Sequence, residues 1–219
     1  MLITLLTLLL ILSWLVGSRH LFYLDVLLTL LSQSLVSTFL DWFCWLFTFL
    51  GSVEFTTLLL LTLGIYLWRK NRKREAVVLV ALFFLAVPIE LVGKRFLPQP
   101  EPPPELTRHI FEVPSLHLST AFSFPSGHML RFAYLSGIVL TLFLRLKNRC
   151  LLAVTLLLVN CLMAFSLIYL GHHWATDVVG SILLASLMLS LMNKYQKSKW
   201  HIKIQNLKKT EREEKELNF

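Results

Sequence analysis

Long apolar segments, separated by short polar stretches, constrain this chain more than any other feature of its sequence. They lie at residues 1–17, 53–68, 76–93, 129–144, 150–169 and 178–192. Their lengths reach or approach the roughly 17 to 25 residues that an α-helix needs to cross a bilayer. With 56% hydrophobic residues and a positive mean hydropathy, the composition is typical of a membrane protein. We therefore predict an all-α, polytopic membrane protein with six transmembrane helices.

The stretch between the first two spans, residues 18–52, is apolar but interrupted. The polar residues that interrupt its regularly spaced leucines include Asp25, Gln33, Ser34 and Asp41. This pattern favours a helix lying in the membrane interface, with an additional span as the alternative. Residues 1–17 lack the charged start and the A-x-A-like cleavage site of a signal peptide, so we expect a retained helix.

Lysine and arginine gather in short segments that all fall on one side of a six-span arrangement: residues 69–75, 145–149 and 193–209. This side is predicted to be cytoplasmic. Membrane topology explains the formal charge of +8 better than nucleic-acid binding does, because the basic residues are not spread over one surface. We predict a single membrane-embedded domain over 1–219, with its core at about 53–192 and a charged cytoplasmic tail at 193–219.

The cysteines predict no disulfide framework. Cys150 lies on the cytoplasmic side, Cys161 lies within a span, and only Cys44 is near the outer face. We interpret them as small buried hydrophobic residues. No Cys/His spacing typical of a metal site appears, so we expect neither a metal nor another cofactor.

The opposite, outer face carries the unusual polar side chains. Lys94 ends the third span, and a stiff, proline-rich stretch follows at 98–106. The chain returns at PSGH, where Ser126 is expected to cap the fourth span and leave the first N–H groups of that helix pointing outward. His173 and Asp177 are four residues apart at the start of the sixth span. On a helix they share one face, so the carboxylate can orient the imidazole.

Together these groups are suited to phosphoryl transfer through a histidine. One imidazole attacks phosphorus while the other protonates the leaving oxygen. Cationic and N–H groups hold the phosphate and stabilise its developing charge, so that no metal is needed. Each residue alone has a simpler interpretation, such as a snorkelling lysine or an interfacial histidine. Their placement at three separate helix ends is what indicates a site.

Three stretches carry a family resemblance: KRFLPQPEP at 94–102, PSGH at 125–128 and SLIYLGHHWATD at 166–177. In this order they resemble the motifs of the type 2 phosphatidic acid phosphatase family, the membrane lipid phosphatases related to vanadium haloperoxidases. Those motifs are Lys-x6-Arg-Pro, Pro-Ser-Gly-His and Ser-Arg-x5-His-x3-Asp. The resemblance extends over residues 60 to 190 or so.

The resemblance implies a role for each matching residue. His173 would be the nucleophile that forms a phosphohistidine, Asp177 its orienting partner, and His128 the general acid for the departing group. Three further residues would bind phosphate oxygens: Lys94, Ser126 and Gly127. His172 lies one position out of register and is interpreted as a neighbour of the nucleophile.

Two departures from the family pattern concern the phosphate-binding arginines. Glu101 stands in the arginine position of the first motif, and Leu167 stands in that of the third. A charge-assisted hydrogen bond contributes about 1.5 to 3 kcal/mol, so the losses leave open a weakened, altered or silent enzyme.

Arg131 is our candidate replacement. It follows His128 by three residues, on the same helical face and one turn deeper, and a charge inside a span is by default a functional hypothesis. The alternative is a structural pair with Glu90. Arg95 and Arg108 in the following loop are further candidates.

We therefore predict an integral membrane phosphatase acting on a lipid phosphate or pyrophosphate at the outer face of a bacterial-type inner (cytoplasmic) membrane. Undecaprenyl pyrophosphate is the first choice of substrate, because outward-facing small members of this family commonly recycle that carrier. Phosphatidylglycerophosphate and phosphatidate follow. The alternatives are a phosphotransferase to another lipid, such as lipid A, and a silent lipid-phosphate binding protein. The expected partners are the lipid substrate and membrane lipids, not nucleic acid.

Overall fold

The computed structural model describes residues 1–108, 122–142 and 147–194. All regular structure within these ranges is helical, which confirms the all-α prediction. Most of the predicted tail, from residue 195 on, lies outside the described residues, as does part of the basic segment at 145–149.

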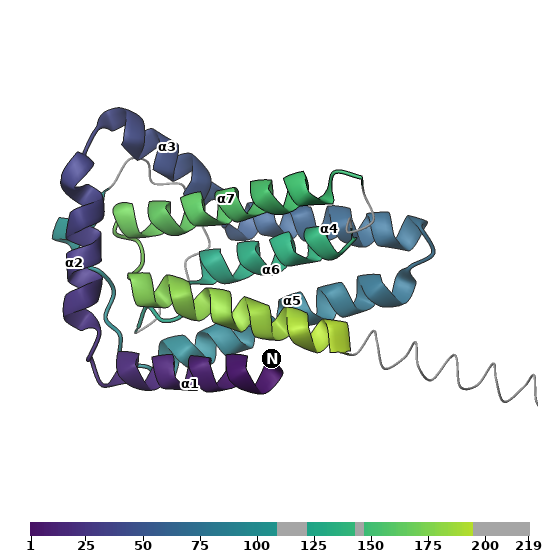
Figure 1. The fold of residues 1–219 in the computed structure, drawn as a ribbon, viewed down its shortest axis with the longest axis horizontal. Coiled ribbons are helices and arrows are strands. Elements are labelled where there is room, and N and C mark those ends of the chain that lie inside the picture. The colour runs from purple at the N-terminus through teal and green to yellow at the C-terminus, as the bar shows by residue number, and fades with distance from the viewer. Residues whose placement is uncertain (109–121, 143–146, 195–219) are drawn as a thin grey trace, which may run out of the picture.

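The helices succeed one another along the chain, and short connections join them except between α5 and α6, where residues 97–126 intervene. They are α1 (Leu2–Gly17), α2 (Phe22–Ser32), α3 (Thr38–Phe49), α4 (Val53–Arg69), α5 (Lys73–Phe96), α6 (Gly127–Leu142) and α7 (Arg149–Tyr169). A further helix, Ala175–Lys194, is the yellow-green ribbon without a label in Figure 1 and is called the last helix below. Short 3-10 turns lie at Gln33–Leu35 and Pro104–Leu106.

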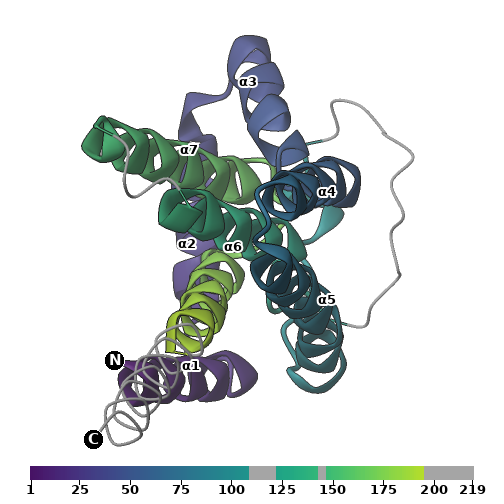
Figure 2. The ribbon, with the colours of Figure 1, turned by 90° about the vertical axis from the view of Figure 1, so that its right-hand side faces the viewer.

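Helices α4 to α7 and the last helix run side by side as a bundle, with α6 innermost (Figures 1 and 2). Leu130, Tyr134 and Leu135 of α6 are fully buried, and they pack in one cluster with Leu79 of α5 and Met188 of the last helix. Because α6 is enclosed on all sides, the groups at its N-terminal end are held in place by several neighbouring helices.

Helix α2 lies across one end of this bundle (Figure 1). It is bent by 90° from α1, and after it the chain turns again at the extended residue Val36. Ser37 then caps α3 by accepting a hydrogen bond from the Leu40 N–H at 3.1 Å, which starts a second helix. The stretch 18–52 therefore holds two helices where one interfacial helix was predicted.

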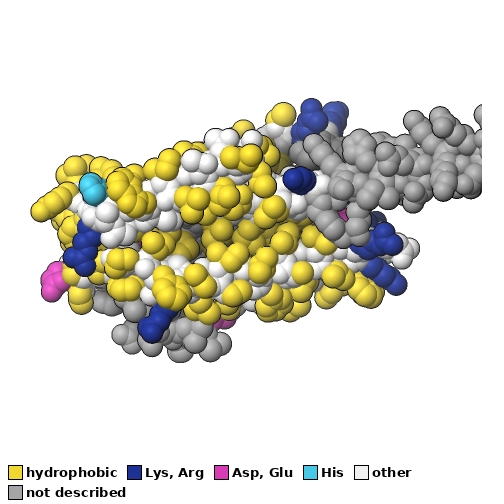
Figure 3. Space-filling model, turned by 90° about the horizontal axis from the view of Figure 1, so that it is seen from below, with side chains coloured by type: hydrophobic (Ala, Val, Ile, Leu, Met, Phe, Trp, Pro, Cys, Tyr) yellow, Lys and Arg dark blue, Asp and Glu magenta, His cyan; other side chains and the backbone are white. Residues whose placement is uncertain are grey.

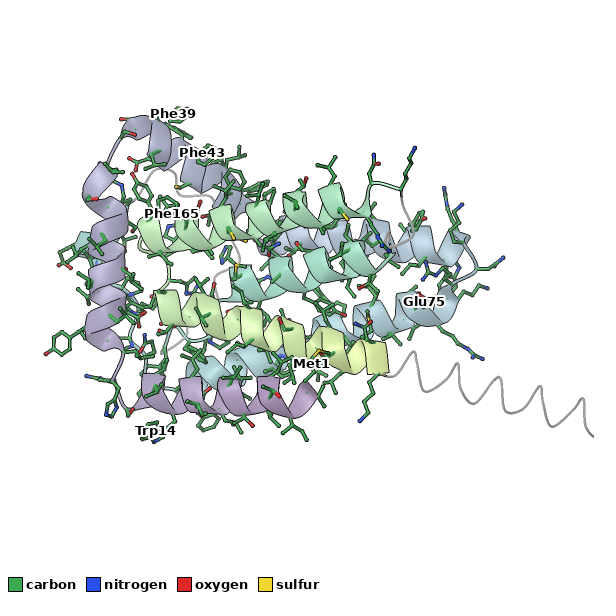
Figure 4. All side chains as sticks on the ribbon, in the orientation of Figure 1. Met1, Trp14, Phe39, Phe43, Glu75 and Phe165 are labelled. Atoms are coloured by element: carbon green, nitrogen blue, oxygen red, sulfur yellow. The ribbon has the colours of Figure 1, made fainter. Side chains whose placement is uncertain are left out.

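Helix α3 slopes back along α7. Phe39 and Phe43 of α3 lie on the same side of the molecule as Phe165 of α7 (Figure 4). The rings of Phe165 and Tyr169 stack with centroids 5.7 Å apart. The two helices form a separate apolar cluster around Cys44, Tyr169 and Leu170.

The described residues contain three helices long and apolar enough to cross a membrane, or up to five if each bent pair of helices counts as one span. The three are α5, α7 and the last helix. Helices α1 and α6 have 16 described residues each, about 24 Å at 1.5 Å per residue, which is short of a hydrocarbon core of about 30 Å. The six-span arrangement thus remains a prediction, whereas the membrane-spanning character is supported.

The surface of the bundle agrees with a membrane environment. Hydrophobic side chains cover most of the face in Figure 3, and Lys and Arg side chains appear mainly toward its two ends. The cysteine prediction was right for Cys44, which is buried, but wrong for Cys150 and Cys161, which are exposed. Both lie on outward-facing positions of α7, where a hydrophobic residue can contact lipid instead of protein.

Candidate active site

Three segments that are far apart in the sequence meet at the end of the bundle that α2 crosses (Figure 1). They are the end of α5 with Lys94, the start of α6 with His128, and the turn after α7 with His173. The ring centroids of His128 and His173 are 6.3 Å apart, with the ring planes inclined by 57°. The two predicted catalytic imidazoles are therefore neighbours.

His173 lies beside a buried carboxylate. Its Nδ1 atom is 3.3 Å from Oδ2 of Asp177, and the side chain of Asp177 has no exposed surface. The same oxygen accepts the Trp174 N–H at 3.1 Å. The other oxygen, Oδ1, has no hydrogen-bond partner among the described residues. Asp177 is thus held toward the turn that carries His173.

The local geometry differs from the predicted one in a single respect. The last helix begins at Ala175, so His173 precedes it and does not lie on a helical face. Instead, Asp177 in the first turn reaches back to the N–H of Trp174, as an acidic residue does in a capping box. The backbone N–H groups of His172 and His173 both donate to the Leu167 carbonyl, at 3.0 and 3.2 Å, which fixes the turn to the end of α7.

Ser126 caps α6, as the sequence predicted. Its Oγ accepts the Met129 N–H at 3.4 Å, and its carbonyl accepts the Leu130 N–H at 3.0 Å. The start of α6 is also joined to the last helix, because Ser181 Oγ donates to the Ser126 carbonyl at 2.8 Å and Ser126 N–H donates to the Asp177 carbonyl at 3.3 Å. The cap therefore connects His128 to Asp177 through the backbone.

Glu90 of α5 joins the two predicted phosphate-binding cations. Lys94 Nζ lies 3.1 Å from Glu90 Oε1, and Arg131 Nη1 lies 3.0 Å from Glu90 Oε2. A Cβ atom added to Gly127 would lie 2.1 Å from Glu90 Oε1, so the carboxylate packs directly against the first residue of α6. Arg131 Nη2 also donates to the Gly51 carbonyl at 3.5 Å, and Nε has no partner within the described ranges.

The positions of the replaced arginines differ in their surroundings. Glu101 is exposed. Leu167 is fully buried in an apolar cluster with Met129, Phe132 and Met163. The interior space that a family arginine would occupy at this position is therefore filled by hydrocarbon.

The two loop arginines, Arg95 and Arg108, also differ in their surroundings. Arg95 is exposed, whereas Arg108 donates to both carboxylate oxygens of Asp41 at 2.6 and 2.7 Å. This hydrogen bonding raises the pKa of the Arg108 guanidinium above its ordinary value. Tyr169 donates to the same carboxylate at 2.6 Å. Arg108 thus joins α3 and α7 through Asp41.

Sequence reasoning missed a second polar cluster beside the histidines. Asp25, Gln99 and Thr176 are buried and hydrogen-bonded to one another. The available sequence signal was an aspartate within an apolar helix, since a buried charge is costly unless it has partners. No group of three or more His, Cys, Asp or Glu side chains in the described part of the chain is arranged to hold a metal.

Comparisons with known proteins agree with this architecture. The structure is similar to the crystal structure of the first transmembrane PAP2 type phosphatidylglycerolphosphate phosphatase from Bacillus subtilis, at 20% identity and a TM-score of 0.78, over 90% of this chain and 96% of that one. It is also similar to the crystal structure of Aquifex aeolicus LpxE, at 25% identity and a TM-score of 0.58, over 78% of this chain and 96% of that one. No curated protein matches by sequence.

The family itself is shown by the sequence. Residues 75–200 match the PAP2 superfamily, a stretch that covers more than half of the chain and contains all the histidines and carboxylates described above except Asp25 and Asp41. This agrees with the resemblance drawn from the three motifs. The chain belongs to the PAP2 superfamily, with a glutamate and a leucine in place of the arginines of its first and third motifs.

Proposed function

We propose that this protein is an integral membrane phosphatase that hydrolyses a lipid phosphate or pyrophosphate through a phosphohistidine intermediate. The observation that carries the proposal is the pairing of His173 with the buried carboxylate of Asp177, beside the ring of His128. An imidazole oriented by a carboxylate next to a second imidazole supplies both a nucleophile and a proton donor.

The orientation of His173 indicates a separate role for each of its two ring nitrogens. Since Nδ1 faces Asp177, the proton lies on Nδ1 and the lone pair on Nε2 is free to attack phosphorus. As the N–P bond forms, the bond from phosphorus to the leaving oxygen breaks, and protonated His128 gives that oxygen a proton. Water then attacks the phosphohistidine. His128 takes the proton of this water, the N–P bond breaks, and inorganic phosphate leaves.

The phosphate is held by the first turn of α6 and the cations beside it. Backbone N–H groups at a helix N-terminus bind anions, and Ser126 and Gly127 begin this helix. Lys94 and Arg131 supply positive charge from α5 and α6. Because Glu90 already pairs with both cations, substrate phosphate competes with an internal carboxylate for them.

The active site faces the outside of the cytoplasmic membrane in this proposal. The basic turn between α4 and α5, at 69–75, lies at the end of the bundle away from α2 and the histidines (Figure 1), and basic segments favour the cytoplasmic side. An outward site suits undecaprenyl pyrophosphate as the first substrate to test. Phosphatidylglycerophosphate is next, since one similar structure is a phosphatase named for that lipid.

The test is phosphate release by the purified protein from a panel of lipid phosphates in detergent, with and without a chelator. We expect release from at least one lipid and no effect of the chelator. Loss of phosphate from the donor lipid only in the presence of a second lipid, such as lipid A, with the phosphate recovered on that second lipid, would indicate a phosphotransferase. The buried Leu167 and the exposed Glu101 favour a silent binding protein as the other candidate, and binding without release would support it.

A further inference from the structure

Asp25, in the first turn of α2, is a buried acidic side chain outside the three family motifs. Only 1% of its surface is exposed. Its Oδ1 accepts the backbone N–H of Thr176 at 2.9 Å, and its Oδ2 accepts the hydroxyl of the same residue at 2.6 Å. Both oxygens thus hold one residue, which is the immediate neighbour of Asp177.

Gln99 extends this contact to the other two motif segments. Its side-chain amide donates to Asp25 Oδ2 at 3.1 Å and to the Thr176 hydroxyl at 3.2 Å. The backbone carbonyl of Gln99 accepts the N–H of Ser123, which lies just before the PSGH stretch, at 2.8 Å. Asp25 therefore lies where the loop after α5, the entry to α6 and the start of the last helix are joined.

A second contact from α2 acts on the same turn. The rings of Phe22 and Trp174 pack in a T-shaped arrangement with centroids 5.7 Å apart, and Trp174 Nε1 donates to the Pro100 carbonyl at 2.7 Å. The backbone N–H of Trp174 is the group that holds Asp177 Oδ2. Helix α2 thus contacts the turn on both sides of Ala175, through Trp174 and through Thr176.

We propose that Asp25 is a positioning residue for phosphoryl transfer, which acts by fixing Thr176 and with it the alignment of Asp177 and His173. This inference rests on the proposed phosphatase function. Burying a carboxylate is costly unless hydrogen bonds compensate, and here the compensating donors come from the turn and its adjoining loop. A displacement of about 1 Å of a catalytic group can cost on the order of 100-fold in rate. A loss of alignment lowers kcat more than it raises KM, because the lipid chain is not held by Asp25.

The experiment combines two measurements on the full-length protein in detergent. Hydrogen exchange is followed in peptides covering residues 170–178, and steady-state kinetics are measured with the lipid phosphate that the wild-type protein hydrolyses. The variants are Asp25→Ala, Thr176→Val and the double variant, with Thr176→Ser as the conservative change that keeps the hydroxyl. Asp41→Ala is the matched control. Asp41 is also a hydrogen-bonded aspartate of the N-terminal region, but its partners are Arg108 and Tyr169 and not Thr176.

We expect Asp25→Ala to speed exchange in 170–178 and to lower kcat about 10- to 100-fold with KM within about twofold of wild type. Thr176→Val should add little to Asp25→Ala, since both remove one interaction. Thr176→Ser should retain most of the rate. Asp41→Ala should leave exchange at 174–178 unchanged, because among the described residues its partners Arg108 and Tyr169 contact this segment only near Leu170.

Unchanged exchange in Asp25→Ala would overturn the positioning role, as would faster exchange with a wild-type kcat. A wild-type protein that releases no phosphate from any lipid would reject the proposed function separately. The exchange measurement would then still decide whether Asp25 orders the turn.

Discussion

Arg131 and Glu90 form a buried ion pair, with Nη1 3.0 Å from Oε2. The other carboxylate oxygen of Glu90 lies 3.1 Å from Lys94. Two cations proposed to bind substrate phosphate therefore share one internal anion, which packs against Gly127 at the start of α6. The net positive charge near the proposed phosphate position is therefore lower than Lys94 and Arg131 would give without Glu90.

The first prediction separates a phosphate-binding role of Arg131 from a structural one. Arg131→Leu should lower the thermal stability, because removing one partner of a buried pair costs about 3 to 5 kcal/mol, here reduced by the remaining Lys94 contact. The Arg131→Leu, Glu90→Leu double variant should recover much of that stability. Melting temperature and turnover are measured on the same preparations. Turnover that stays low in the stable double variant supports phosphate binding by Arg131, and turnover that recovers contradicts it.

The second prediction concerns the histidines. His173→Ala should abolish turnover and any covalent phosphoenzyme, because it removes the attacking nitrogen. His128→Ala should slow formation of the phosphoenzyme with a poor leaving group and matter less with a good one. Asp177→Asn should lower kcat while lipid binding is mostly retained. Phosphoenzyme is trapped by acid quench with labelled substrate, and normal activity of His173→Ala would refute the mechanism.

The third prediction uses two glycines as a matched pair. Gly127→Ala would place a methyl group 2.1 Å from Glu90 Oε1, so the carboxylate must move away from α6 and disturb Lys94 and Arg131. We expect lower stability and at least tenfold lower kcat/KM. Gly64→Ala is the control, because a Cβ there meets nothing within 4 Å. It should be neutral or stabilise by about 0.5 to 1 kcal/mol, since alanine is favoured over glycine in helices. Equal effects of the two changes would disprove the contact.

The fourth prediction restores the family arginines one at a time. Leu167→Arg should strongly destabilise the protein, because it places a charge in the apolar cluster around Met163 without a partner. Glu101→Arg should change the stability by less than about 0.5 kcal/mol, because residue 101 is exposed. Melting temperatures in detergent test both changes. A stable Leu167→Arg variant with increased turnover would contradict the buried position of this side chain.

The fifth prediction tests the orientation in the membrane. In a variant without the three native cysteines, a cysteine at Glu105 should react with a membrane-impermeant reagent from outside, and one at Asn71 should not. Both positions are exposed, so accessibility depends on the side of the membrane and not on burial. Permeabilised cells provide the control in which both sites react. Labelling of both sites in intact cells would overturn the outward-facing site.

Much of the fold class could be predicted from the sequence, as could the set of side chains that the structure brings together around His128 and His173. Apolar segments of near-spanning length require helices in a bilayer, because backbone groups must be satisfied within each segment. The Ser126 cap was also predictable, since a small hydroxyl residue before an apolar run satisfies the first N–H groups of a helix. These features depend on neighbours close in the sequence.

Other features were decided only by the tertiary structure. The division of 18–52 into two helices, the sharing of Glu90 by Lys94 and Arg131, and the contact of Asp25 with Thr176 all join residues that local pattern does not connect. Asp25 and Thr176 are 151 positions apart in the chain. A buried charge must find partners wherever the packed helices bring donors together, and the sequence shows the need for a partner without showing which residue meets it.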